Sequence, residues 1–208
     1  MSESKKVYIF GYSGHAFVVI ESLLDAGYSI GGYFDFNEAT RNPYNIPYLG
    51  FEGEVDLKQI VNSDFVFPAI GDNSTRQKLV GLFEELNLNQ LTIVDPSAKI
   101  SRTARIAGST YIGKNAILNA QCDVKKGVII NSQATIEHNC IIDDFVHIAP
   151  NAVLCGNVHV GSATFIGANS VIRENQTVCS NAIVGAGAVI VKSITDKGIW
   201  VGNPVHKL

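Results

Sequence analysis

The sequence is poor in cysteine and tryptophan and has little net charge. Its 208 residues include 4 cysteines, 1 tryptophan and a formal net charge of −3 at pH 7. The cysteines, Cys122, Cys140, Cys155 and Cys179, form no CxxC pair, which argues against a disulfide framework and predicts a reducing cytoplasm. No block of like charge is present, so nucleic acid and anionic membranes are poor candidates for the main partner.

Long hydrophobic runs are also missing. The first residues, MSESKKVYIFGYSG, contain one short apolar run, residues 7–10, which is too short for the core of a signal peptide. No later stretch is long enough to span a bilayer, so we expect no membrane insertion. The length suits one large domain or two small ones.

What the sequence does contain is a six-residue repeat in its second half. Every sixth residue from Ile100 onward, ending at Ile190, is Ile, Leu or Val. Three residues after these anchors, Asn or Gly dominates, and both tolerate the left-handed backbone conformation of a sharp corner. A hexapeptide period is typical of a parallel β-helix. Three hexamers would close one triangular turn, so that residues 18 apart lie above one another at roughly 4.8 Å.

Residues 5–95 instead alternate apolar runs with helical patterns. Strands are predicted for KKVYIF, SIGGYFD, DFVFPAIG and LTIV, and helices for AFVVIESLLDAG, EVDLKQIVN and NSTRQKLVGLFEELN. This alternation predicts a parallel sheet flanked by helices. Asp95-Pro96 marks the switch to the repeat, so we predict two domains, 1–95 and 96–208.

Three loops at the ends of the predicted strands are candidate ligand sites, because open parallel sheets bind ligands at the carboxyl ends of their strands. The loop GYSGH, residues 11–15, opens a helix whose free N–H groups favour a phosphate. Asp35 ends the second strand, where an acidic residue commonly binds a ribose or base. Residues 71–73 end the third, with Arg76 one turn further. GxSGH differs from GxGxxG, and a plain tight turn explains it equally well.

The combination of GxSGH, AIGDN with a following Arg, and a hexapeptide prism resembles the sugar acetyltransferases of the sialic-acid and bacillosamine type. The resemblance covers essentially the whole chain. It implies an α/β Rossmann-like domain followed by an all-β left-handed parallel β-helix, the handedness coming from the resemblance alone. It also implies a homotrimer that moves acetyl from acetyl-CoA to the amino group of a nucleotide-linked amino sugar.

The resemblance also assigns binding residues. The nucleotide sugar would be held by Ser13, Gly14, His15, Asp35, Gly71 and Asn73. Ala168 and Ala186, which are 18 residues apart, would offer backbone groups to coenzyme A, although good packing of alanine at a corner explains them equally well.

His138 is the candidate general base. Acetyl transfer from a thioester to an amine needs a base, a donor to the oxyanion and aligned substrates, and histidine suits the first role because its usual pKa is near neutrality. His138 approaches a corner, where a side chain can face outward. The family usually carries an acidic residue next, whereas this chain has Asn139. An amide lacks the charge that would raise the basicity of the imidazole.

The repeat predicts that Gly156, 18 residues after His138, lies one coil above it. A glycine there leaves its N–H open to a ligand, and the matching N–H in the resembling enzymes lies near the thioester carbonyl. By the same resemblance His147 contacts acetyl-CoA, the alternative being an exposed strand residue bound to water. His159 has no motif partner and is interpreted as structural.

Three other functions stay open from the sequence. An O-acetyltransferase of sialic acid or a related sugar would use the same fold. A prism-type carbonic anhydrase needs three clustered histidines for zinc, and with His138 and His147 alone we expect no metal. A nucleotide-sensing scaffold would need no catalytic group at all.

Overall fold

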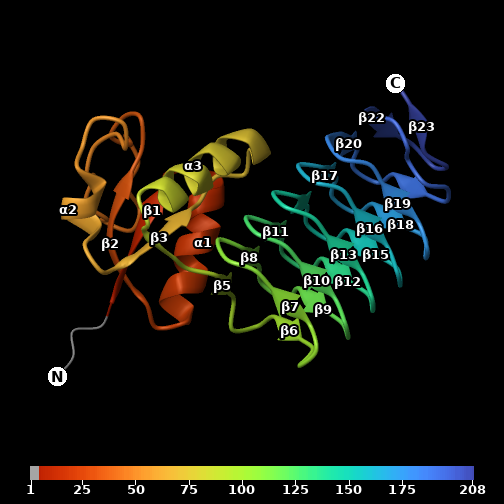
Figure 1. The fold of residues 1–208 in the computed structure, drawn as a ribbon, viewed down its shortest axis with the longest axis horizontal. Helices are drawn as coiled ribbons and strands as arrows, with labels where there is room; N and C mark the ends of the chain where they lie inside the picture. The colour runs from red at the N-terminus through yellow and green to blue at the C-terminus, as the bar shows by residue number, and fades with distance from the viewer. Residues whose placement is uncertain (1–4) are drawn as a thin grey trace.

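An α/β domain lies against one end of a long three-sided prism (Figure 1). The computed structural model describes residues 5–208. Strand–helix alternation builds the first part and the six-residue repeat builds the second, as the sequence predicts.

The amino-terminal domain is a 4-stranded parallel sheet with helices on both faces. Its elements are β1 (Lys6–Phe10), α1 (Gly14–Asp25), β2 (Ser29–Phe34), α2 (Leu57–Val61), β3 (Phe65–Pro68), α3 (Asn73–Glu85) and β4 (Asn89–Gln90), and the strand order is β2–β1–β3–β4. Alternate residues of β1 point to opposite faces. Ile9 packs with Leu23 of α1, and Phe10 packs with Phe83 of α3, so each helix covers one face.

The last strand of this sheet differs from the prediction. Residues 91–94, LTIV, were expected to form one strand, but the sheet ends with Asn89–Gln90. Ile93–Val94 form β5, which pairs with β8 (Tyr111–Ile112) in the prism. The chain crosses between the two parts here, because the Leu91 N–H donates to Val66 while the Ile93 N–H donates to Thr110. β5 therefore already belongs to the prism, just before Asp95-Pro96.

Three parallel sheets form the sides of the prism. Face 1 has 8 strands, β5, β8, β11 (Ile129–Ile130), β14 (His147–Ile148), β17 (Phe165–Ile166), β20 (Ala182–Val184), β22 (Gly198–Val201) and the antiparallel β23 (His206–Lys207). Face 2 has 6 strands, β6 (Lys99–Ile100), β9 (Ile117–Leu118), β12 (Thr135–Ile136), β15 (Val153–Leu154), β18 (Val171–Ile172) and β21 (Val189–Ile190). Face 3 has 5 strands, β7 (Arg105–Ile106), β10 (Asp123–Val124), β13 (Ile141–Ile142), β16 (His159–Val160) and β19 (Thr177–Val178).

The register of these sheets confirms the 18-residue turn. Thr135 pairs with Val153, and Asp123 pairs with Ile141. The anchor residues point inward and form one continuous apolar core, in which Ile136 and Leu154 are 0% exposed. Burial of this column of branched side chains is what stabilises the prism.

The corners also follow the prediction. From Ser109 to Gly187, the residues three after the anchors have positive φ, for example 62° at Asn139 and 60° at Asn151. Phe145 and Ala163 adopt the same conformation, with φ of 60° and 58°, although neither is Asn or Gly. The corner geometry is therefore imposed by the coil, and Asn or Gly merely lowers its cost.

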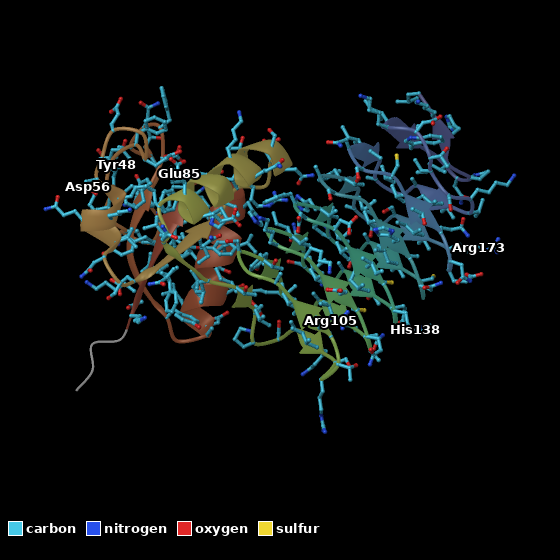
Figure 2. All side chains as sticks on the ribbon, viewed as in Figure 1. Tyr48, Asp56, Glu85, Arg105, His138 and Arg173 are labelled. Carbon is cyan, nitrogen blue, oxygen red and sulfur yellow. The ribbon has the colours of Figure 1, made fainter. Side chains whose placement is uncertain are left out.

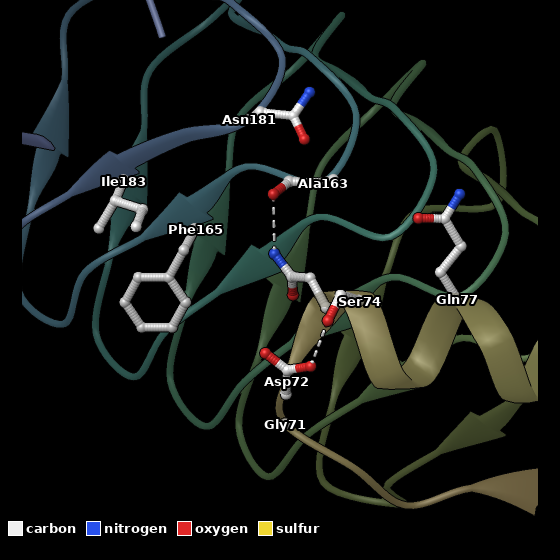
Figure 3. A pocket seen from close by; sticks show the side chains of 9 residues that line it. Gly71, Asp72, Ser74, Gln77, Ala163, Phe165, Asn181 and Ile183 are labelled. Carbon is white, nitrogen blue, oxygen red and sulfur yellow. Dashed lines mark hydrogen bonds between the residues drawn. The ribbon is translucent and has the colours of Figure 1, made fainter. Parts of the chain in front are cut away.

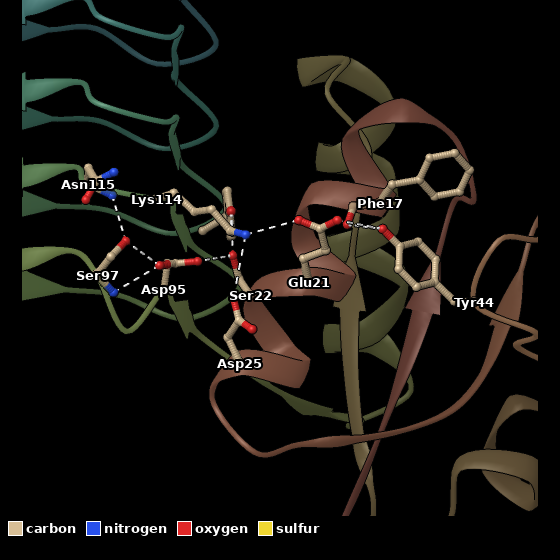
Figure 4. A network of polar contacts seen from close by, with 10 residues as sticks. Phe17, Glu21, Ser22, Asp25, Tyr44, Asp95, Ser97, Lys114 and Asn115 are labelled. Carbon is tan, nitrogen blue, oxygen red and sulfur yellow. Dashed lines mark hydrogen bonds and ion pairs between the residues drawn. The ribbon is translucent and has the colours of Figure 1, made fainter.

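A buried polar network joins α1 to the first coil of the prism (Figure 4). Ser22 Oγ donates to Asp95 Oδ2 at 2.6 Å and lies 2.9 Å from the Tyr111 hydroxyl. Burial raises the pKa of Asp95, but hydrogen bonds from Ser22 and Ser97 outweigh it and hold that pKa below its usual value. At the exposed rim, Lys114 pairs with Glu21 at 3.0 Å.

Among the helices of residues 5–208, none combines the length and apolar character needed to cross a membrane.

Candidate active site

His138 lies at the corner between faces 2 and 3, on the loop from β12 to β13, and is exposed. Figure 2 shows it at the edge of the prism that points away from α1 and α3. Its ring rests on Gly156: a Cβ built on that glycine would lie 2.5 Å from His138 Cε1 and 2.6 Å from Nε2. The two residues are thus brought together as the repeat predicts, and only glycine fits beneath the ring.

Asn139 fixes the tautomer of this histidine. Its Oδ1 lies 3.0 Å from His138 Nδ1, and because a carboxamide oxygen only accepts, Nδ1 carries the proton. Nε2 then has a free lone pair that can accept a proton from a substrate. Asn139 therefore orients the base in addition to forming the corner.

A second candidate site is a cavity of about 480 Å³ between the start of α3 and face 1 (Figure 3). Asn73 bridges its two walls, since its Nδ2 donates to the carbonyl oxygens of Ala163 at 3.0 Å and Thr164 at 3.2 Å. The cavity is lined by Gly71, Asp72, Asn73, Ser74 and Gln77 from the amino-terminal domain and by Ala163, Phe165, Asn181 and Ile183 from the prism. Amide and hydroxyl groups beside an aromatic ring suit a sugar, which has both polar and apolar surfaces.

Asp72 gives this cavity a negative charge. Its Oδ1 caps α3 by accepting from the Thr75 N–H at 2.8 Å, the Thr75 hydroxyl at 2.7 Å and the Ser74 hydroxyl at 2.8 Å. These hydrogen bonds lower the pKa of Asp72 to about 2. The carboxylate is therefore ionised at neutral pH.

Known proteins share the fold of the whole chain. The family model of the PglD N-terminal domain matches residues 6–83. The acetyltransferase domain of PglB from Neisseria gonorrhoeae is 31% identical, with a TM-score of 0.89, over 98% of this chain and 100% of that one. PerB from Caulobacter crescentus, solved with CoA and GDP-perosamine, is 30% identical, with a TM-score of 0.92, over 98% of this chain and 97% of that one. The chain belongs to the hexapeptide-repeat nucleotide amino-sugar acetyltransferases.

Two further matches are weaker. WeeI from Acinetobacter baumannii is 24% identical with a TM-score of 0.87, and it shows the shared fold alone. The uncharacterized protein L142 of Acanthamoeba polyphaga mimivirus is 34% identical over 119 residues, which are 55% of this chain and 22% of that protein. This chain thus spans about a fifth of the length of that curated relative.

In this acetyltransferase His147 lies on face 1, next to the cavity and apart from His138. Its Nδ1 donates to the Gly71 carbonyl oxygen at 3.2 Å, and its Nε2 accepts from Asn131 Nδ2 at 3.2 Å. Burial, followed by the charge of Arg76, lowers the pKa of His147 to about 4. His147 is 8% exposed, so the alternative of an exposed strand residue bound to water is wrong, while contact with acetyl-CoA stays a prediction.

His15 lies behind the same wall. Its ring centroid is 6.2 Å from that of His147 and 5.6 Å from that of Tyr111. Burial, then the charges of His147 and Arg76, lower its pKa to about 3. Its Nε2 is buried without a hydrogen-bond partner among the residues that the structure describes.

The other predicted substrate residues lie along one edge of the amino-terminal sheet. Ser13 and Gly14 are exposed at the start of α1, where the Ser13 side chain makes no capping bond. Asp35 is engaged within the chain, because its carboxylate accepts from the N–H groups of Tyr12 at 2.8 Å and Phe36 at 2.7 Å. Phe36, which the sequence analysis did not single out, is 72% exposed beside it.

The predicted coenzyme A residues lie at another corner. Ala168 and Ala186 follow β17 and β20, at the corner between faces 1 and 2, and the Ala168 carbonyl accepts from the Gly187 N–H at 2.8 Å. They stack in one column as predicted, but face 2 separates them from His138 and Gly156. Within the described residues, no cluster of three or more His, Cys, Asp or Glu side chains could hold a metal ion.

Proposed function

We propose that this protein transfers acetyl from acetyl-CoA to the amino group of a nucleotide-linked amino sugar, with His138 as the general base. One observation carries the proposal: an exposed imidazole, held by Asn139 with Nε2 free, lies at a glycine-lined corner of the prism. Its support comes from PerB, whose structure contains CoA and GDP-perosamine.

The chemistry follows from these groups. The sugar amine attacks the thioester carbonyl, and His138 Nε2 takes the proton that the nitrogen loses. The carbon–sulfur bond then breaks, and the same proton passes from His138 to the leaving thiolate, which releases the thiol of coenzyme A and restores the neutral imidazole. Gly156, which lies against the ring of His138, would offer its backbone N–H to the oxyanion. Loss of the carboxylate that usually follows the histidine leaves Asn139 to orient the ring without raising its basicity.

The proposal also assigns binding sites to the nucleotide, the sugar and the pantetheine arm of coenzyme A. Nucleotide binding is assigned to the edge formed by Ser13, Gly14, His15 and Asp35, and sugar binding to the cavity at Gly71 and Asn73. The pantetheine arm is assigned to the column of Ala168 and Ala186 and to His147.

A complete site then requires a second copy of the chain. His138 lies at the corner between faces 2 and 3, which in a triangular prism is opposite face 1, where the cavity lies. Face 2 runs from the corner of His138 to the corner of Ala168 and Ala186, and its outer side is mostly apolar. Ile117, Val153, Val171 and Val189 lie along it, together with Lys99 and Thr135. A homotrimer with closed symmetry covers such a face and brings His138 of one copy beside the cavity of the next.

Replacement of His138 by alanine tests the reaction. We expect His138→Ala to lower turnover at least about a hundredfold, the usual effect of losing a general base. Release of the coenzyme A thiol would be measured with UDP-, GDP- and CMP-linked amino sugars and with their hydroxyl-only counterparts. His159→Ala, on face 3, is the matched control and should keep normal turnover.

The same assay separates the alternatives. Acetylation of hydroxyl-only sugars alone would favour the O-acetyltransferase. Near-normal turnover of His138→Ala would remove that histidine from the role of base. If no sugar is acetylated by the wild-type protein, the proposal is wrong and the sensing scaffold gains support.

A further inference from the structure

The side chain of Arg76 crosses from the amino-terminal domain into the prism. Arg76 lies in the first turn of α3 and is 0% exposed. A guanidinium can be buried at tolerable cost only when its N–H groups are paired. Here all of its nitrogens donate to oxygen atoms in the two parts of the molecule.

On the prism side Arg76 binds two corners of one column. Its Nε donates to the Gly127 carbonyl at 2.6 Å, and its Nη2 donates to the Phe145 carbonyl at 2.9 Å. Gly127 and Phe145 are 18 residues apart, between faces 3 and 1, and Ala163 continues the column. Asn73 binds the carbonyl of Ala163, so the first turn of α3 is attached to three successive coils.

On the other side Arg76 holds the wall of the cavity. Its Nη1 donates to the carbonyls of Ile70 and Gly71, each at 3.1 Å, and its Nη2 donates to Asn73 Oδ1 at 2.8 Å. The Gly71 carbonyl also accepts from His147. The guanidinium therefore fixes both the backbone and the amide orientation of the turn that faces the cavity.

Carboxylates take no part in these contacts. Arg76 donates to backbone carbonyls and to one amide oxygen, while the carboxylate of Asp72 accepts from Ser74 and Thr75. Such contacts depend on direction, and the planar fork of arginine can satisfy several carbonyls at once in a way that a lysine ammonium cannot. The hydrogen bonds of Arg76 therefore fix how residues 70–73 are oriented against the prism, in addition to holding the two parts together.

We propose that Arg76 is a positioning residue for the sugar: it fixes residues 70–73 against the prism and thereby sets the shape of the cavity that receives the amino sugar. This inference rests on the proposed function of the cavity. Arg76 itself does not line the cavity, so it acts through Gly71 and Asn73.

The test is a comparison of Michaelis constants. Arg76→Lys keeps the positive charge but cannot reach the turn and both prism corners together. We expect KM for the nucleotide sugar to rise at least about tenfold, the effect of losing one or two hydrogen bonds to a charged group, while KM for acetyl-CoA stays within about twofold. Turnover at saturation should change less than KM for the sugar.

A matched control distinguishes the positioning of residues 70–73 from a general loosening of the contact between the amino-terminal domain and the prism. Lys126 also joins the prism to α3, through a 2.8 Å ion pair with Glu84, but this pair is at the exposed rim and does not touch residues 70–73. Lys126→Met should leave both Michaelis constants unchanged. Melting temperatures of both variants would be recorded alongside.

A second variant tests the other end of the link. Asn73→Ala removes the contacts with Arg76 and with Ala163, and it should raise KM for the sugar as well. Both substitutions remove the same contact between Arg76 and Asn73, so their effects on KM for the sugar should not add in the double variant. If Arg76→Lys fails to fold, Arg76→Gln replaces it, with the same expectation for the two Michaelis constants, because the inference concerns Arg76 and Asn73 itself lines the cavity.

Two results would overturn the inference. One is an unchanged KM for the sugar in the folded variants, and the other is an equal rise for the sugar and for acetyl-CoA. Failure of the wild-type protein to acetylate any amino sugar would instead refute the proposed function, and calorimetric binding of the nucleotide sugars to the wild-type and Arg76→Lys proteins would then decide the role of Arg76.

Discussion

At the scale of single residues, the proposed chemistry depends on how closely His138 lies against Gly156. The ring is held on one side by Asn139 and on the other by the backbone of the next coil. Both contacts follow from the 18-residue turn, which places a glycine directly above the histidine. The position of the base is therefore set by backbone geometry.

Gly156→Ala should displace the base. The added methyl group would lie 2.5 Å from His138 Cε1, so the exposed ring must move. We expect turnover to fall by roughly ten- to a hundredfold, and the free energy of unfolding to change little because the ring can turn into solvent. Kinetic assays and urea unfolding would measure both quantities.

Gly108 provides the control for this substitution. It occupies the same place in its hexamer, two residues after the anchor Ile106, and a Cβ there meets nothing within 4 Å. Gly108→Ala should keep full activity. Equal activity of the two variants would show that the contact between Gly156 and His138 is unimportant for turnover.

The buried histidines should make stability depend on pH. The pKa of His147 is lowered to about 4 in the folded protein, against about 6.5 in an unfolded chain, so the unfolded state binds more protons between these values. The free energy of unfolding should therefore fall with decreasing pH below about 6.5, by about 2 kcal/mol for His147 between pH 7 and pH 5. His15, with a pKa lowered to about 3, acts in the same direction.

Urea unfolding at pH 7 and pH 5 would measure this dependence. His147→Gln should flatten it, whereas His206→Gln, at an exposed residue of β23, should leave it unchanged. A slope that is identical in the wild-type protein and in His147→Gln would contradict the assignment of His147 as a buried neutral group.

At the scale of the elements, the corners determine how the coil is built. Corner residues adopt φ near +60°, a conformation that costs most residues about 1 kcal/mol or more and asparagine or glycine less. The repeat of Asn along the chain is thus explained by backbone strain without any role in binding. Each corner can be tested separately.

Asn151 is a suitable corner because it is exposed and has φ of 60°. Asn151→Ala should lower the free energy of unfolding by about 1 kcal/mol, whereas Asn151→Gly should be close to neutral. Chemical denaturation of the three proteins gives the comparison. Equal stability of the alanine and glycine variants would show that the left-handed conformation is not what selects Asn.

The repeat also shows which parts of the fold the sequence predicts and which it does not. The inward-pointing anchors and the 18-residue register of the prism were predicted, because the six-residue repeat determines both. Docking of the two parts was not predicted, yet a signal exists. Asn is the commonest residue in two of the three corner columns, whereas the column under α3 has Ser109, Gly127, Phe145 and Ala163 before it reaches Asn181. The strand LTIV was misplaced because its apolar pattern suits either sheet, and only tertiary contacts decide between them.

The cavity was the part of the site that the sequence predicted least. Gly71 and Asn73 were predicted as site residues from their place after a strand, but Phe165, Asn181 and Ile183 come from the prism. No local pattern connects these positions, which lie about a hundred residues further along the chain. Arg76 likewise was recognised as part of a motif, while its burial was not.

At the scale of the whole molecule, the separation of His138 from the cavity predicts shared sites. Sedimentation should give a trimer, and a monomer would contradict the proposal. A stronger test mixes two inactive proteins. In His138→Ala the base is missing, and in Gln77→Trp a large side chain fills the cavity from α3. Each protein alone forms only defective sites.

Co-expression of the two variants should restore activity. In a trimer whose sites each combine His138 of one copy with the cavity of its neighbour, random mixing leaves about a quarter of the sites with both parts intact. Activity of the mixed trimers should therefore approach about a quarter of the wild-type value, against nearly none for either variant alone. Sites contained within one chain could never be restored by mixing, so absence of recovery in verified mixed trimers would refute the shared site while leaving the acetyltransferase family of the chain unaffected.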